Sequence, residues 1–74
     1  MYLMLEDGGA VNLLRVDRVT VVDYRDEGDG WAVVALKRLA TNTAPFHQYY
    51  TVKSGCTEEE ARDLVRTIVE DINR

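Results

Sequence analysis

The C-terminal stretch from Thr57 to Arg74 carries the pattern that most constrains the fold. Apolar residues recur there at every third or fourth position, which places them on one stripe of an α-helix: Ala61, Leu64, Val65, Ile68, Val69 and Ile72. Thr57 followed by Glu60 has the form of a capping box, in which each side chain accepts a hydrogen bond from a free backbone N–H of the first turn. We therefore predict a helix over residues 58–73 that needs an apolar surface to cover.

The chain before this helix consists of short apolar or β-branched runs separated by turn residues. Asp7-Gly8-Gly9 predicts a hairpin turn, and the charged stretch Arg25 to Gly30 predicts a loop. The predicted strands span residues 2–5, 10–16, 19–25, 31–39 and 47–54. The second and third runs meet at Asp17-Arg18, and the sequence leaves open whether they are two strands or one strand with a bend.

The most apolar of these runs, Trp31 to Leu36, is apolar on both of its faces, which is typical of a central strand. Short turns between the strands favour antiparallel neighbours. The sequence thus predicts an α+β fold, a bent antiparallel sheet of four to five strands with one C-terminal amphipathic helix packed on it. Residues 1–74 are expected to form a single domain.

The stretch Val11 to Val22, taken together with the capped terminal helix, carries a resemblance to a known group of proteins. It resembles the small bacterial single-domain proteins with a pleckstrin-homology-like, strongly bent sheet, in which an Asn-Leu-x-x-Val-type strand is paired with a C-terminal helix that plugs the sheet. The resemblance implies a binding or scaffolding role and supplies no catalytic residue.

Charge and composition exclude several classes of function. Thirteen acidic against nine basic residues give a net charge of −4, which argues against direct nucleic-acid binding. The longest apolar run is far shorter than the roughly 20 residues of a membrane span, and the first residues lack the pattern of a signal peptide. We expect a cytoplasmic protein that does not bind membranes, has no cofactor and no metal, and is not an enzyme.

Two sets of residues that could carry chemistry have simpler interpretations. His47 and Cys56 could form a nucleophile–base pair, but an extended chain rising about 3.3 Å per residue would hold them more than about 20 Å apart. We predict instead that Cys56 is a small residue in the corner between the last strand and the helix. Four acidic residues lie close together in and beside the charged loop: Asp23, Asp26, Glu27 and Asp29. Their spacing does not match that of an EF-hand, so we expect a solvated turn and not a calcium site.

Aromatic residues give the more suggestive pattern. Tyr49 and His47 share the face of the last strand opposite Tyr50, and further aromatic side chains could join them on the sheet face that the helix leaves uncovered. The alternative is that these side chains complete a small core. The predicted partner-binding residues are Tyr24, Trp31, Phe46, His47 and Tyr49.

These observations predict a non-enzymatic protein-interaction module that presents a sheet face or edge to a protein partner. The alternative is a small acidic inhibitor of the phage type, which blocks a basic nucleic-acid-binding surface of a host enzyme. A homodimer is also expected, because one helix covers one face of an open sheet whose central strand is apolar on both. A sheet bent enough to close over its own core would remove that need.

Overall fold

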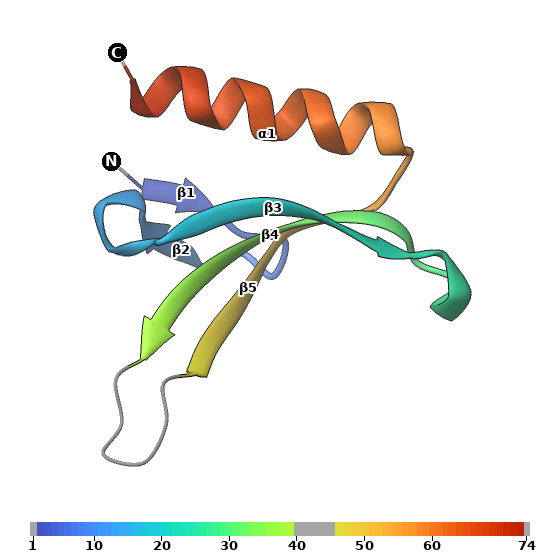
Figure 1. The fold of residues 1–74 in the computed structure, drawn as a ribbon, viewed down its shortest axis with the longest axis horizontal. Coiled ribbons are helices and arrows are strands. Elements are labelled where there is room, and N and C mark those ends of the chain that lie inside the picture. Colours follow the sequence, from blue (N-terminus) through green and yellow to red (C-terminus); the bar gives the residue numbers. More distant parts are fainter. Residues whose placement is uncertain (1, 40–45, 74) are drawn as a thin grey trace.

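The computed structural model describes residues 2–39 and 46–73, with Leu39, Phe46 and His47 described by their backbone alone. Two antiparallel sheets and one helix form an α+β fold (Figure 1). The smaller sheet pairs β1 (Tyr2–Met4) with β2 (Ala10–Asn12), and the larger has the order β3-β4-β5. The remaining elements are β3 (Arg18–Tyr24), β4 (Gly30–Leu39), β5 (Phe46–Cys56), the helix α1 (Glu58–Ile72) and the 3-10 turns η1 (Leu13–Arg15) and η2 (Arg25–Glu27).

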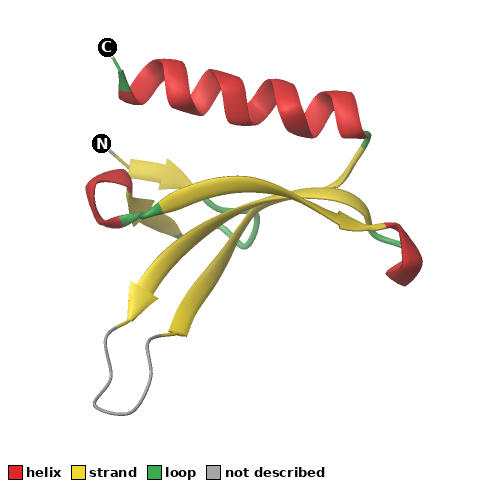
Figure 2. Cartoon of the chain, in the orientation of Figure 1, coloured by secondary structure: helices red, strands yellow, loops and turns green. Residues whose placement is uncertain are grey.

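The division into two sheets corrects the prediction of a single sheet of four to five strands. The predicted strand 10–16 ends at Asn12, because the side-chain oxygen of Asn12 accepts a hydrogen bond from the Leu14 N–H at 3.0 Å. This local bond competes with a strand ladder and starts the turn η1, so the chain leaves β2 before it enters β3 (Figure 2). The runs on either side of Asp17 are therefore two strands in different sheets.

The prediction of a central strand at Trp31 to Leu36 is confirmed. β4 pairs with β3 on one side, where Arg18 lies opposite Leu36, and with β5 on the other, where Tyr49 lies opposite the same residue. All residues from Ala32 to Leu36 are buried. Val34, for example, is 1% exposed.

β5 is longer and less regular than predicted. It continues to Cys56 through Gly55, which has φ +67°, and its register with β4 shifts between Trp31 and Val33 and again between Val33 and Val34. Figure 1 shows β4 and β5 bending away from α1 toward the end at which they are joined. The irregular register accommodates a bend of this kind.

The helix is anchored as the capping pattern predicts. The Glu60 N–H donates to Thr57 Oγ1 and the Thr57 N–H donates to Glu60 Oε1, both at 3.1 Å. Ala61 and Ile68 are fully buried and the next stripe residues are partly buried, whereas Val69 is 44% exposed. The last turn of the stripe thus extends beyond the apolar surface that the helix covers. The core beneath α1 is Val33, Ala35, Val52, Cys56, Ala61 and Ile68.

The β1–β2 hairpin is attached to the edge of the larger sheet at β5. The Glu6 N–H donates to the Thr51 carbonyl oxygen at 3.1 Å, and the Ser54 hydroxyl donates to Glu6 Oε1 at 2.5 Å. Leu3 and Leu5 pack against the same core as α1. The hairpin and the helix therefore share one face of the larger sheet. Within the described ranges, no helix is long and apolar enough to cross a bilayer.

Candidate interaction face

The two faces of the β3-β4-β5 sheet have different surroundings. Along β4, Trp31, Val33 and Ala35 belong to the core beneath α1 or pack against it. Side chains alternate between the faces of a strand, so Ala32, Val34 and Leu36 point to the opposite face. These three are buried, but they are not members of the cluster that contains the helix and the hairpin. The outer face is the face of the sheet formed by these three residues and the flanking residues of β3 and β5.

The outer face contains a groove that crosses all three strands. The groove has a volume of about 320 Å³ and is lined by Arg18, Thr20, Val22, Leu36 and Tyr49. Arg18, Leu36 and Tyr49 form one row across the sheet, since each lies opposite the next in the strand register. Tyr49 is 64% exposed and forms one wall. An apolar floor with an exposed aromatic wall and a cation at one end is suited to contact with another protein.

The structure places the five predicted partner-binding residues in different surroundings. Tyr49 lines the groove, as predicted for the uncovered face. Tyr24 lies opposite Gly30 near the far end of the sheet, six positions along β4 from the residue that faces Tyr49, which is about 20 Å of strand. The backbones of Phe46 and His47 belong to β5, and their side chains lie outside the described part of the chain. Tyr24 and Tyr49 therefore do not belong to one aromatic cluster.

Trp31 is a correction, because it lies on the face that the helix covers. Its ring packs against the core, and the Arg25 guanidinium sits 5.1 Å from the ring centroid, a distance typical of a cation–π contact. The alternation along β4 groups Trp31 with Val33 and Ala35. For Trp31, this placement favours the alternative of a core-completing aromatic, and its role in partner binding stays a prediction.

Four groove residues were not predicted as partner-binding residues: Arg18, Thr20, Val22 and Leu36. Three of them are alternate residues of β3, so a period of two starting at Arg18 is the signal that could have identified them. The sequence analysis missed this signal because the strand was expected to start one residue later, at Val19. In addition, Val19 and Val21 make the other face of the strand equally apolar.

Charged groups lie at the two ends of β3. At its C-terminal end, Asp23 accepts hydrogen bonds from the backbone N–H and the guanidinium of Arg25, with Nη2 to Oδ2 at 2.9 Å. These hydrogen bonds hold the pKa of Asp23 below its usual value and raise the pKa of Arg25. The following turn carries Asp26 and Glu27, both exposed. β3 thus has a cation at its start and an acidic turn after its end.

Cys56, a candidate nucleophile, has a structural position. Cys56 is buried at the end of β5, immediately before the capping residue Thr57, and its thiol lies 3.7 Å from the Ser54 carbonyl oxygen. The prediction of a small residue in the strand-to-helix corner is confirmed. Over residues 2–39 and 46–73, no group of three or more His, Cys, Asp or Glu side chains is arranged to hold a metal ion.

Comparison with known proteins adds no relative to this description. No protein-family model, no curated protein and no solved structure matches the chain. The resemblance to small bacterial proteins with a pleckstrin-homology-like sheet therefore stays a prediction.

Proposed function

We propose that this chain is a non-enzymatic protein-interaction module that docks through the outer face of the β3-β4-β5 sheet. One observation carries the proposal: the central strand directs Ala32, Val34 and Leu36 away from the face that holds both the helix and the hairpin. Beside this floor stands the exposed ring of Tyr49. Aromatic side chains next to an apolar floor supply most of the binding energy in protein interfaces.

A second copy of the chain is the occupant that the charges favour. β3 begins at Arg18 and is followed by a turn that carries Asp26 and Glu27. A two-fold axis that lies between two such faces and runs across their strands would bring Arg18 of each copy toward the acidic turn of the other. The pairing would cover the exposed ring of Tyr49 and oppose unlike charges at both ends, which favours encounter in this orientation.

The alternative of an acidic inhibitor depends on clusters of acidic side chains, one of which lies at the head of α1. There the charge is reduced, because Arg62 forms an ion pair with Glu58 at 2.8 Å and Arg66 lies 3.5 Å from Asp63. These exposed pairs add little stability, yet they make the helix surface a mixture of both signs. The outer face is therefore the better supported surface.

Sedimentation equilibrium at micromolar concentration tests the proposal. The expected result is a reversible dimer at twice the 8.4 kDa mass of the chain, weakened only moderately as salt is raised, since salt screens the charge pairs at the two ends and not the apolar contact. A monomer of 8.4 kDa across the whole accessible range would refute the dimer.

Two matched variants locate the contact. Tyr49→Ser should weaken the dimer about tenfold or more, since loss of an interface aromatic costs more than about 1.4 kcal/mol. Tyr2→Ser removes a similarly exposed ring from the β1–β2 hairpin, on the other side of the larger sheet, and should leave the dimer unchanged. Equal effects of both variants, or a dimer that dissociates steeply with salt, would exclude the outer face as the contact.

A further inference from the structure

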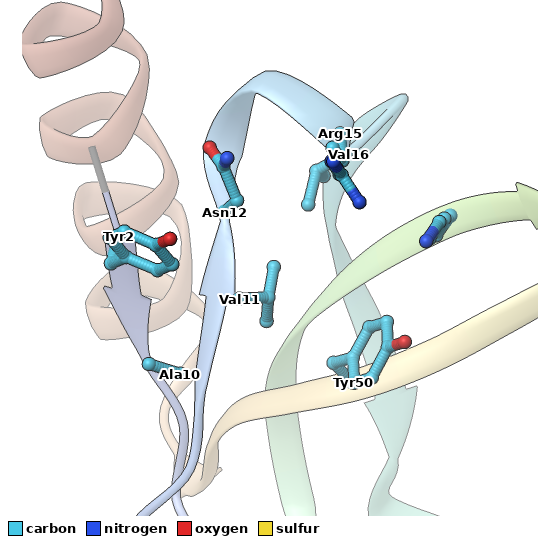
Figure 3. A pocket seen from close by; sticks show the side chains of 8 residues that line it. Tyr2, Ala10, Val11, Asn12, Arg15, Val16 and Tyr50 are labelled. Atoms are coloured by element: carbon cyan, nitrogen blue, oxygen red, sulfur yellow. The ribbon is translucent and has the colours of Figure 1, made fainter.

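A second hollow lies on the opposite side of the larger sheet, between the hairpin and the ends of β4 and β5. It has a volume of about 360 Å³, within the range of about 300–1,000 Å³ usual for small-molecule sites (Figure 3). Four separate parts of the chain supply its walls: the hairpin, the turn η1 with the residue after it, β4 and β5. The lining residues are Tyr2, Ala10, Val11, Asn12, Arg15, Val16, Lys37 and Tyr50.

The charge of this hollow is opposite to that of the whole chain. Two of its eight lining residues, Arg15 and Lys37, are basic and none is acidic, although the chain has a net charge of −4. Neither cation forms an ion pair with any residue of the described ranges. The acid nearest in sequence to Arg15, Asp17, uses its Oδ2 to accept a hydrogen bond from the Arg38 N–H at 2.5 Å. The fold therefore brings two cations, 22 positions apart in the sequence, to one hollow, and no described residue forms an ion pair with either.

Lys37 lies at a strand position on the core side of the sheet, and no residue of the described part of the chain forms an ion pair with it. It continues the row of Trp31, Val33 and Ala35 on the face of β4 that points to the core, and it is half-buried there. Burying the aliphatic stem of a lysine is favourable while its ammonium group stays available to an opposite charge. An anion bound beside Lys37 would supply that charge.

The rest of the wall suits an apolar group next to the anion. Val11 and Tyr50 contribute an aliphatic and an aromatic surface, and Figure 3 shows both side chains below the turn that carries Arg15. The side-chain oxygen Oδ1 of Asn12 accepts a hydrogen bond from the Leu14 N–H, so the side-chain nitrogen Nδ2 is the group left to donate one. The donors available at this end thus all favour an acceptor that carries negative charge.

We propose that this hollow binds a small organic anion, a carboxylate or phosphate attached to a compact aromatic body. The charged group lies between Arg15 and Lys37, and the aromatic body rests against Val11 and Tyr50. The site is independent of the outer face, because Tyr50 and Lys37 lie on the opposite side of the sheet from Tyr49 and Leu36.

Titrations followed by amide chemical shifts test this site with four probes: phenyl phosphate, benzoate, inorganic phosphate and benzyl alcohol. Phenyl phosphate and benzoate should both shift the amides of Asn12, Val16 and Lys37 along saturating curves in the millimolar range. The order of their affinities identifies which anionic group the site prefers. Benzyl alcohol, which lacks the charge, should cause no saturating shift.

Charge-removing variants provide the matched controls. Arg15→Gln and Lys37→Gln should each weaken phenyl phosphate about tenfold, as expected for loss of a charge-assisted hydrogen bond. Lys53→Gln removes the same charge from an exposed position of β5 outside the hollow and should have no effect. Arg15→Lys keeps the charge and should retain most of the affinity, and retained dispersion of the amide spectrum will show that each variant is folded.

Three results would overturn the proposal. The first is a linear, non-saturating response to phenyl phosphate and benzoate. The second is equal weakening by Lys53→Gln, which would indicate screening of the whole chain by a diffuse anion. The third is inorganic phosphate binding as tightly as phenyl phosphate, which would exclude Val11 and Tyr50 as the wall for an aromatic body.

Discussion

Replacing Ile68 by alanine should remove most of the stability of this fold. Ile68 is 5% exposed and packs in the core beneath α1 with Val33, Ala35 and Val52. The substitution deletes three carbon groups, and at about 0.8 kcal/mol for each the transfer cost is about 2.4 kcal/mol. A cavity that stays open between helix and sheet raises the cost to about 3–4 kcal/mol. A core of this size supplies only about 3–5 kcal/mol, so the variant should be largely unfolded at room temperature.

Urea unfolding followed by circular dichroism provides the measurement. With an m-value of about 1 kcal/mol/M for a chain this short, Ile68→Ala should lower the midpoint by about 3 M or abolish the transition. Ile68→Val, which costs about 1 kcal/mol, keeps a measurable transition if the alanine variant has none. Val69→Ala is the matched control, because Val69 is 44% exposed and its truncation should cost less than about 1 kcal/mol. Equal midpoint shifts for Ile68→Ala and Val69→Ala would refute the assignment of the buried helix face.

Three further predictions concern the cap and the glycines. Thr57→Ala should lower the free energy of unfolding by about 1 kcal/mol in the same urea assay. Thr57→Asp should lower it little, since aspartate can accept a hydrogen bond from the same first-turn N–H. Equal losses for the two variants would exclude capping as the role of Thr57. Hydrogen bonding to Thr57 lowers the pKa of Glu60, so this stabilisation is complete above the usual glutamate pKa of about 4.3 and is lost as pH falls through the lower folded value. Acidification should therefore destabilise the wild type more than Glu60→Gln, and parallel pH profiles would contradict this. Gly30→Ala should lower the free energy of unfolding more than Gly55→Ala. Both glycines have positive φ, but only at Gly30 would a Cβ meet another atom closely, the Cys56 carbonyl oxygen at 3.0 Å. Equal losses of stability would show that backbone strain alone acts.

The helix was the most predictable element, because its signals are local. The capping residues and the apolar period lie within one segment, so the start at Glu58 follows from nearest neighbours alone. The division into two sheets was not predictable in the same way. It depends on a hydrogen bond between Asn12 and Leu14 that competes with strand pairing, and the β-branched residues around it favour a strand equally well.

The placement of the predicted partner-binding residues on the sheet followed from the sequence only in part. The exposure of Tyr49 was predictable, because exposed and less exposed positions alternate along β5 from Tyr49 to Cys56. Trp31 was placed on the wrong face because β4 is apolar on both faces, so its sequence contains no signal for which face the helix will cover. The role of either residue in partner binding stays a prediction. The hollow with Arg15 and Lys37 had no sequence signal, since its walls come from four segments that only the tertiary fold brings together.

The attachment of the hairpin at Glu6 has a consequence for how the molecule opens. In the described part of the chain, the hairpin backbone is joined to β5 by the Glu6–Thr51 hydrogen bond, whereas β4 is paired with a strand on both sides along most of its length. The β1–β2 unit should therefore detach in a subglobal fluctuation that leaves β3, β4, β5 and α1 folded. Native-state hydrogen exchange would then show two levels of protection, with the Val11 amide exchanging well before that of Val34. Each such opening would dismantle the wall of the anion hollow while the outer face stays intact, so a bound anion would raise protection in the hairpin alone.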